Sequence, residues 1–283
     1  MICVQHLSFG YTPKQNLIED MNFSVAQGEI FGFLGPSGAG KTTLQKILVG
    51  LLPRYGGSVQ LAGQQCGRHN ADFYEKIGID FEFSTLYEKL TAAENLRFFA
   101  SLYRKTPRPA GALLAAVGLQ NDADKRVSDY SKGMKARLNF ARALLHDPDV
   151  LFLDEPTSGL DPTNSSVMKQ LILAEKAAGK TIILTTHNMQ DAAELCDRVA
   201  FIVNGGIRAL GTPHELVMSR GAAQVAYTYV ADGAECTGSC PINALSGDER
   251  LQTLLRQNRL LSIHSSEPTL NDIFIDVTGR TLL

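Results

Sequence analysis

The glycine-rich loop GPSGAGKTT at residues 35–43 constrains this chain more than any other feature. The apolar run IFGFL (30–34) precedes it, and the segment 41–52 follows with apolar residues at helical spacing. In a strand, loop and helix of the form G-x-x-x-x-G-K-[ST], the glycines let backbone N–H groups point inward at phosphate oxygens. A chance glycine-rich turn would lack this flanking strand and helix, so we expect a phosphate-binding loop.

Each residue of the loop has an expected part in holding ATP. Lys41 places an ammonium on the β- and γ-phosphates, where it serves both binding and catalysis, and the Thr42 hydroxyl is placed to bind Mg²⁺. The expected nucleotide-binding positions of the loop are Gly35, Pro36, Ser37, Gly38, Ala39, Gly40, Lys41, Thr42 and Thr43. The expected cofactors are therefore ATP and Mg²⁺.

A pair of carboxylates follows a second buried strand, VLFLD at residues 150–154. Asp154 is expected to hold Mg²⁺ through its outer coordination sphere. Glu155 is expected to orient an attacking water and accept its proton. A merely solvated acidic pair is the alternative, which the phosphate-binding loop in the same chain argues against.

A second candidate anion site lies in SDYSKGMKAR at residues 128–137. Ser131 stands where a helix should begin, and Gly133 follows it. A helix N-terminus offers backbone N–H groups and a partial positive charge to an anion. Ser131 could equally be a plain N-cap, and the two roles are compatible. The chain thus offers two phosphate sites for one nucleotide.

The order of strand-like and helical segments indicates an α/β protein with a P-loop NTPase core and a mostly parallel sheet. The expected strands are 21–26, 30–34, 58–63, 77–81, 150–154, 181–186 and 198–203, and the expected helices are 41–52, 91–103, 110–119, 163–178 and 188–196. Thr91 and Glu94 form a capping box at the start of one helix. A helical subdomain of about 85–147 is inserted into this core.

A change of pattern near residue 220 predicts a domain boundary, with an ATP-binding domain at 1–220 and an accessory region at 221–283. The accessory region is expected to be a small α+β extension, with a strand at 221–233 and two helices around LLSIHSS. Cys236 and Cys240 are too few for a zinc site without further ligands, so a solvated loop with two free thiols is expected.

Composition limits the class of protein. Hydrophobic residues make up 44% of the chain and charged residues 20%, which suffices for a packed core, and the net charge of −2 gives no general attraction to nucleic acid. No apolar run approaches the roughly 20 residues that span a bilayer. We expect no signal peptide from the N-terminal residues, and five cysteines without a regular framework fit a reducing cytoplasm.

Taken together, these segments resemble the ATP-binding subunit of an ABC transporter over residues 1 to about 217. The matching segments follow the family's order: Tyr11 for adenine stacking, GPSGAGKT for Walker A, YSKGM (130–134) for the Ser-Gly-Gly-Gln motif, LFLDEP (151–156) for Walker B, SGLD (158–161) for the loop that crosses the dimer interface, and His187 for the switch histidine.

The resemblance implies a head-to-tail pair of ATP-binding subunits, expected to be a homodimer. Ser131 and the Gly133 backbone of one subunit would close over the γ-phosphate held by Lys41 of the other. Asp161 would lie in the loop that crosses this interface. The helix dipole behind Ser131 supports the same role. One ATP shared between two subunits therefore explains two phosphate sites.

Two of the residues that carry the resemblance have a second interpretation. His187 could be a strand-end histidine packed against the sheet, but the preceding strand delivers it to the same sheet edge as Asp154. Tyr11 is favoured for adenine stacking, and Phe9 is the competitor, because stacking needs an exposed ring.

The chain departs from the family pattern at three positions. Glu82 stands where the family usually has glutamine, which adds negative charge near the metal; the alternative is a Glu82 that faces solvent. Lys132 and Met134 replace the usual glycine and glutamine. Lys132 can still lie beside phosphate.

The segment EPTLNDIFIDVTGR (267–280) resembles the end of ATPases that serve exporters of drugs, lipids and polysaccharides. The expected function is the motor subunit of an exporter, cytoplasmic and peripheral on the inner face of the membrane. It would dock on a separate transmembrane permease through residues 83–103. The alternative is a soluble ABC ATPase acting outside transport, which does not predict this tail. The transported substrate stays open.

Overall fold

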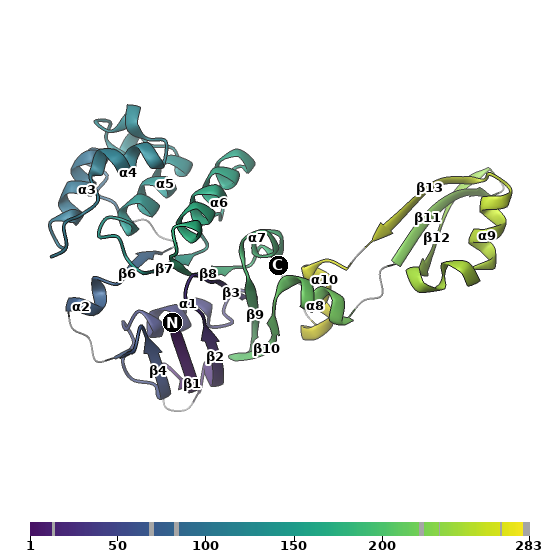
Figure 1. Cartoon of the computed structure of the whole chain (residues 1–283), viewed down its shortest axis with the longest axis horizontal. Coiled ribbons are helices and arrows are strands. Elements are labelled where there is room, and N and C mark those ends of the chain that lie inside the picture. The colour runs from purple at the N-terminus through teal and green to yellow at the C-terminus, as the bar shows by residue number, and fades with distance from the viewer. Residues whose placement is uncertain are drawn as a thin grey trace. The chain divides into compact units, whose positions relative to one another are not determined.

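The protein is described here by a computed structural model. The structure describes residues 1–12, 15–67, 71–81, 85–220, 224–231, 233–266 and 268–279. The chain forms two compact units, Met1–Leu210 and Gly211–Thr281 (Figure 1). The sequence predicts a boundary near residue 220. The structure divides the chain earlier, between Leu210 and Gly211, so helix α8 (Pro213–Arg220) belongs to the second unit.

A six-stranded sheet with the strand order β10-β9-β3-β8-β7-β6 forms the centre of the first unit. Its strands are β3 (Ile30–Leu34), β6 (Ile77–Asp80), β7 (Val150–Asp154), β8 (Thr181–Thr186), β9 (Arg198–Val203) and β10 (Gly206–Gly211). The pairs β3–β8, β3–β9, β6–β7 and β7–β8 are parallel. Every residue of β3, β7 and β8 is buried, which explains why these strands are almost continuously apolar.

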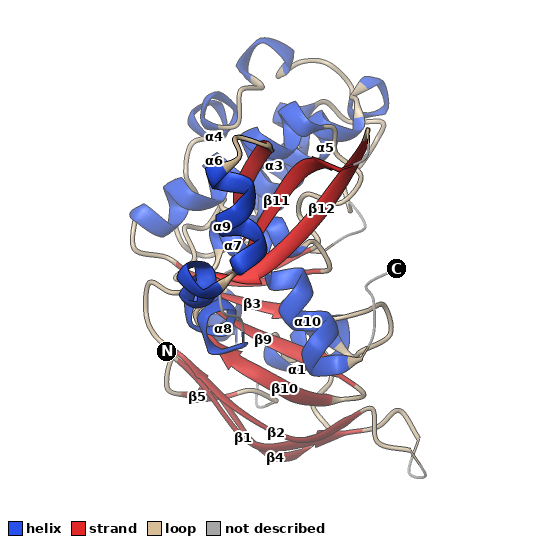
Figure 2. Ribbon diagram, turned by 90° about the vertical axis from the view of Figure 1, so that its right-hand side faces the viewer, coloured by secondary structure: helices blue, strands red, loops and turns tan. Residues whose placement is uncertain are grey.

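A second, antiparallel sheet with the order β2-β1-β4-β5 lies in the same unit. Its strands are β1 (Ile2–Phe9), β2 (Ile18–Val25), β4 (Gly56–Leu61) and β5 (Gln64–Gln65). Figure 2 shows it as a layer separate from the six-stranded sheet. The strands expected at 21–26 and 58–63 therefore belong to an antiparallel sheet, and β1 is an additional strand. Alternating burial along β1 and β2 marks a sheet with one face on the core.

Aromatic rings join the two sheets. The Phe23 ring on β2 lies 5.7 Å from the Phe31 ring and 5.1 Å from the Phe33 ring, measured between centroids, and both partners are on β3. All three side chains are buried in one apolar cluster. The β3 strand, which leads into the phosphate-binding loop, is thus anchored to the antiparallel sheet through the face that carries Phe31 and Phe33.

The first unit also contains helices, of which α3, α4 and α5 lie within residues 85–147. They are α1 (Lys41–Leu48), α2 (Ala71–Tyr74), α3 (Ala92–Ala100), α4 (Ala110–Ala116), α5 (Lys132–Ala143), α6 (Pro162–Ala177) and α7 (Met189–Leu195). Figure 1 shows α3, α4 and α5 grouped together at one side of the unit. The capping box of Thr91 and Glu94 is confirmed at the start of α3. Within the described ranges, no helix has the length and apolar character that crossing a membrane requires.

The second unit has its own small core. After α8 come β11 (Gln224–Ala231), β12 (Ala234–Pro241), a 3₁₀ turn (Ile242–Gly247), α9 (Glu249–Arg256), β13 (Leu260–Ser266) and α10 (Leu270–Thr278). The sheet order is β12-β11-β13, with both pairs antiparallel. Its core consists of Val225, Tyr227, Tyr229, Cys240, Leu251 and Leu254. This unit has the predicted α+β character.

The two cysteines of the second unit lie on a strand, and the expected solvated loop is wrong. Cys236 pairs with Tyr229 and Cys240 pairs with Val225 in the ladder between β12 and β11. Cys240 is buried in the core of the unit, and both thiols are free. Cys240 thus belongs to this small core, and the partly buried Cys236 packs against it.

Candidate functional site

The phosphate-binding loop connects the end of β3 to the start of α1. Gly38 and Gly40 have φ angles of 79° and 101°, a region that favours glycine. A Cβ on Gly35 would collide with the Ile202 carbonyl oxygen on β9. Gly40 is the N-cap of α1 and supplies no side-chain cap. The backbone at the start of α1 therefore suits a phosphate group, as predicted.

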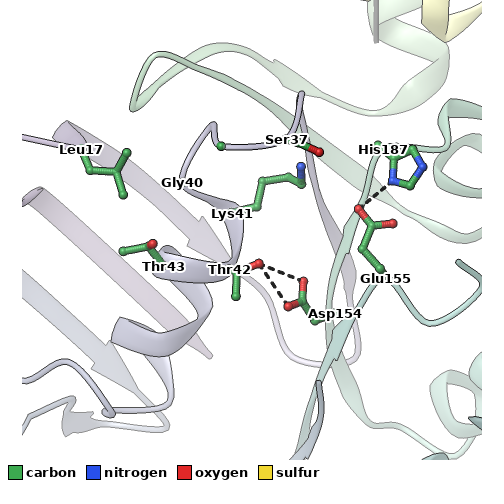
Figure 3. Close-up of a pocket in the computed structure, with 10 residues that line it drawn as sticks. Leu17, Ser37, Gly40, Lys41, Thr42, Thr43, Asp154, Glu155 and His187 are labelled. Atoms are coloured by element: carbon green, nitrogen blue, oxygen red, sulfur yellow. Dashed lines mark hydrogen bonds and ion pairs between the residues drawn. The ribbon is translucent and has the colours of Figure 1, made fainter. Parts of the chain in front are cut away.

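Lys41 is held over this loop. Its side chain is buried, and Nζ donates to the Gly35 carbonyl oxygen at 2.7 Å and to the Pro36 carbonyl oxygen at 3.2 Å. Figure 3 shows it facing the same space as Glu155 and His187. The loop carbonyls thereby fix a cation beside the position expected for phosphate.

Thr42 on α1 and Asp154 at the end of β7 are in contact. The Thr42 hydroxyl donates to Asp154 Oδ2 at 3.1 Å, as Figure 3 shows. The Thr185 hydroxyl on β8 also donates to Asp154, and Gln45 Nε2 on α1 donates to the Leu153 carbonyl oxygen at 3.1 Å. A hydroxyl and a carboxylate are oxygen donors of the type that Mg²⁺ prefers. Thr42 and Asp154 therefore fit the predicted metal.

No self-sufficient metal cage exists in the described ranges, since they contain no group of three or more His, Cys, Asp or Glu side chains able to hold an ion. Magnesium in nucleotide sites is usually held by one or two protein oxygens together with phosphates. Thr42 and Asp154 are such a partial set, which fits a metal that arrives with a nucleotide.

Glu155 and His187 form a pair beside the loop. His187 Nδ1 lies 2.9 Å from Glu155 Oε1, and the Glu155 side chain is only 12% exposed. Glu155 has a φ of 51°, an uncommon conformation for a residue other than glycine, and its N–H donates to the Thr185 carbonyl oxygen at 3.0 Å. Strained backbone of this kind is concentrated at functional sites.

His187 lies away from the interior of the sheet, and its switch role stays a prediction. The residue follows β8, and its side chain is 55% exposed, so it does not pack into the sheet. The neighbouring Asn188 caps α7 by accepting from the N–H groups of Gln190 and Asp191 at 3.0 and 3.2 Å. Strand end and helix cap together hold the imidazole against Glu155.

These side chains line one pocket of about 280 Å³. Its lining residues are Leu17, Ser37, Gly38, Gly40, Lys41, Thr42, Thr43, Asp154, Glu155 and His187. Leu17, which precedes β2, was not predicted from the sequence. A pocket with a cation, a metal-type donor pair and a carboxylate that can take a proton can bind and cleave a phosphate anhydride.

Tyr11 stands near this pocket with an exposed ring. The residue is 62% exposed, and its hydroxyl lies 3.1 Å from Thr43 Oγ1. Phe9 is buried and meets Tyr11 edge to face, with 5.0 Å between centroids. Tyr11 can therefore offer a ring face and Phe9 cannot, although the adenine contact of Tyr11 stays a prediction.

Ser131 and Gly133 lie elsewhere in the chain. Ser131 caps α5 by accepting from the Met134 N–H at 3.2 Å, so its capping role is confirmed. In the described part of the chain, the residues that line the Lys41 pocket include neither Ser131 nor Gly133. Asp161 caps α6 by accepting from the Asn164 N–H at 3.0 Å. Glu82 lies outside the described residues.

Sequence reasoning missed Asp80, at the end of β6. The side chain is buried and accepts a hydrogen bond from Asn139 Nδ2 on α5. Burial raises the pKa of Asp80 to about 7, with the Asp154 charge adding to the effect and the Arg142 charge and the Asn139 hydrogen bond opposing it. One acidic residue in the otherwise apolar segment IGIDF was the available signal.

The fold and the pocket define a P-loop ATPase. Known proteins with similar sequences and structures identify the family. A family described as "ABC transporter" matches residues 18–158. A fluoroquinolones export ATP-binding protein of Mycobacterium tuberculosis (strain H37Rv) is 49% identical over 100% of this chain and 94% of its own length. The Nod factor export ATP-binding protein I of Rhizobium sp. (strain N33) is 34% identical over 94% of this chain and 93% of its own.

A solved structure of the ATP-binding subunit of an ABC transporter is also similar, with a TM-score of 0.69 and 31% identity over 77% of this chain and 92% of that one. The chain belongs to the ABC transporter family. It is an ATP-binding subunit that hydrolyses ATP to power transport, and the alternative of an ATPase without a transport role is not favoured.

Proposed function

We propose that this chain is the motor subunit of an exporter and works as a homodimer on a separate membrane permease. The proposed dimer is supported by the separation of the two groups of expected phosphate-binding residues, which do not share the Lys41 pocket within the described part of one chain. One pocket unites Lys41, Thr42 and Glu155, whereas Ser131 stands apart as the cap of α5. A second copy can supply the missing Ser131 segment. The export names of the relatives support the direction of transport.

The reaction in the pocket follows from its own residues. Lys41 and the N-terminal backbone of α1 bind the phosphates and offset their charge. Thr42 and Asp154 would hold Mg²⁺, which supplies further charge neutralisation when bound. Glu155 orients a water and accepts its proton, while a neutral His187 can donate from Nδ1 to the Glu155 carboxylate and fix its orientation.

In the dimer, Ser131 and the first turn of α5 would approach the γ-phosphate from the partner. The Ser131 hydroxyl accepts from Met134 as a cap and retains its own proton for donation to a phosphate oxygen. The α5 dipole favours an anion at this end. Closure then depends on a γ-phosphate, so that hydrolysis loosens the pair.

An aromatic surface on the helical region is the proposed docking site for the permease. Tyr87 is 49% exposed, Phe98 42% and Leu102 65%. The Tyr87 ring lies 5.0 Å from Phe98 and 5.8 Å from Phe99, centroid to centroid. A clustered, exposed apolar surface of this kind is typical of a protein interface. It lies within residues 83–103, of which 83 and 84 are outside the described part.

The proposed homodimer is tested by mixing two inactive subunits. A Ser131→Arg subunit paired with a Lys41→Ala subunit has one doubly damaged site and one intact site. We expect ATPase activity in the mixture and none in either variant alone. A mixture that stays inactive, together with a protein that stays monomeric with ATP and Mg²⁺, would overturn the shared site.

A further inference from the structure

The starts of α5 and α6 are packed against each other within one chain. Gly133 is the second residue of α5 and is buried. A Cβ on Gly133 would lie 2.5 Å from Cγ, 2.6 Å from Oδ1 and 2.8 Å from Nδ2 of Asn164 on α6. Contacts this short are not tolerated, so the Asn164 amide occupies the space that any larger residue at 133 would need.

The Asn164 amide is also held from its other side. Its Nδ2 donates to Asp161 Oδ2 at 2.6 Å, and its backbone N–H donates to Asp161 Oδ1 at 3.0 Å. These hydrogen bonds lower the pKa of Asp161. Rotation of Asn164 away from Gly133 would break a hydrogen bond to a charged acceptor, which is stronger than one between neutral groups. Moving the Asn164 side chain away from Gly133 therefore costs a hydrogen bond to Asp161.

A neighbouring contact shows the contrast. A Cβ on Gly159, in the loop before Asp161, would meet the Nζ atom of Lys132. That atom is the far end of a flexible and exposed side chain, so Lys132 could move aside. Asn164 is short and donates two hydrogen bonds to Asp161, and it is therefore the rigid part of this junction.

We propose that Asn164 is the positioning residue that sets the Ser131–Gly133 segment against the Asp161 loop. Position 133 is then glycine because Asn164 fills its Cβ space. The Ser131–Gly133 segment and the Asp161 loop both belong to the proposed interface between the two subunits, so the inference rests on the proposed shared site. Asn164 acts on the nucleotide bound by the partner subunit, through Ser131.

The test is a double-mutant cycle of the wild-type protein, Gly133→Ala, Asn164→Ala and the double variant. We expect Gly133→Ala to lower steady-state ATPase activity about tenfold or more when Asn164 is present, because the added methyl displaces the amide. We expect the same change to cost less than about twofold when residue 164 is already alanine, because the two positions are coupled. An equal loss in both backgrounds would overturn the proposal.

Two readouts separate positioning from general damage. The affinity of the isolated monomer for ATP should not change in Asn164→Ala. In a mixture with Lys41→Ala subunits, Asn164→Ala subunits should recover activity, because the intact Ser131 segment then faces the intact Lys41 loop. Suppose that Ser131→Arg and Lys41→Ala subunits complement each other but Asn164→Ala and Lys41→Ala subunits do not. Asn164 would then act on the nucleotide site of its own subunit, and the inference would be overturned.

Gly111→Ala is the matched control, because a Cβ at that exposed position on α4 meets nothing within 4 Å. It should leave ATPase activity unchanged in both backgrounds. If Ser131→Arg and Lys41→Ala do not complement and no dimer forms with ATP, the proposed function fails first. If the subunits complement but the double-mutant cycle shows no coupling between Gly133 and Asn164, only the proposed role of Asn164 is overturned.

Discussion

Replacing Asp80 by asparagine should make the stability of the first unit less sensitive to a rise in pH from about 4 to 7. The Asp80 carboxyl is buried at the end of β6, bonded to Asn139, and near Arg142, which itself donates to the Ile79 carbonyl oxygen at 3.1 Å. Burial raises its pKa from 3.8 to about 7. The Asp80→Asn change keeps the shape of the side chain and removes the titration.

The sign follows from proton binding. Between about pH 4 and 7 the unfolded chain has released the Asp80 proton and the folded chain still holds it. The free energy of unfolding therefore falls as pH rises through this window, and falls little further above it. Each pKa unit corresponds to about 1.4 kcal/mol, so the full window corresponds to roughly 4 kcal/mol and the part from pH 5 to pH 8 to roughly 2.5 kcal/mol.

The assay is urea unfolding followed by circular dichroism at pH 5 and pH 8, without nucleotide or metal. The wild-type protein should lose roughly 2.5 kcal/mol more between these pH values than Asp80→Asn does. Contributions from histidines are shared by the two proteins and cancel in the comparison. Asp124→Asn, at an exposed carboxyl, is the matched control and should behave as the wild-type protein. An equal pH 5 to pH 8 difference in the wild-type protein and Asp80→Asn would refute the reasoning.

Three further predictions concern the nucleotide pocket. His187→Ala should lower ATPase activity about 10²-fold or more while ATP still binds, because Glu155 loses the partner that orients it; full activity in a turnover assay would remove this role. Tyr11→Ala should weaken ATP binding about 5- to 100-fold, as expected for loss of base stacking, whereas an unchanged dissociation constant in equilibrium dialysis would exclude the adenine contact. Glu82→Gln should retain ATPase activity with its Mg²⁺ dependence shifted to higher concentration, and an unchanged Mg²⁺ titration would favour a solvent-facing Glu82.

Local sequence was enough to predict the parts of the site that depend on short segments. The loop around Lys41 is set by its own glycines. Asp154 ends the buried strand β7, Glu155 directly follows it, and His187 directly follows the buried strand β8. Because parallel strands present their carboxyl ends at one edge, strand prediction also brought these residues together. Their roles in catalysis stay predictions until the variants are measured.

Features that depend on distant contacts were not predicted. β1 pairs with the next strand, β2, and also with β4, which lies far along the chain, so the antiparallel sheet is not visible in local periodicity. The burial of Asp80 comes from packing against α5. The contact between Gly133 and Asn164 joins the starts of two helices. Such side-chain packing between distant segments leaves no repeat or spacing in the sequence.

The measurement that tests the shared site most directly is the mass in solution of Glu155→Gln with ATP and Mg²⁺. Loss of the group that accepts a proton should slow hydrolysis about 10²- to 10⁴-fold and leave binding intact, so ATP should persist in the pocket. We predict a stable dimer that holds two ATP molecules, and a monomer when ATP is replaced by ADP. A Glu155→Gln protein that turns over ATP at the wild-type rate, or that binds ATP and stays monomeric, would contradict the account.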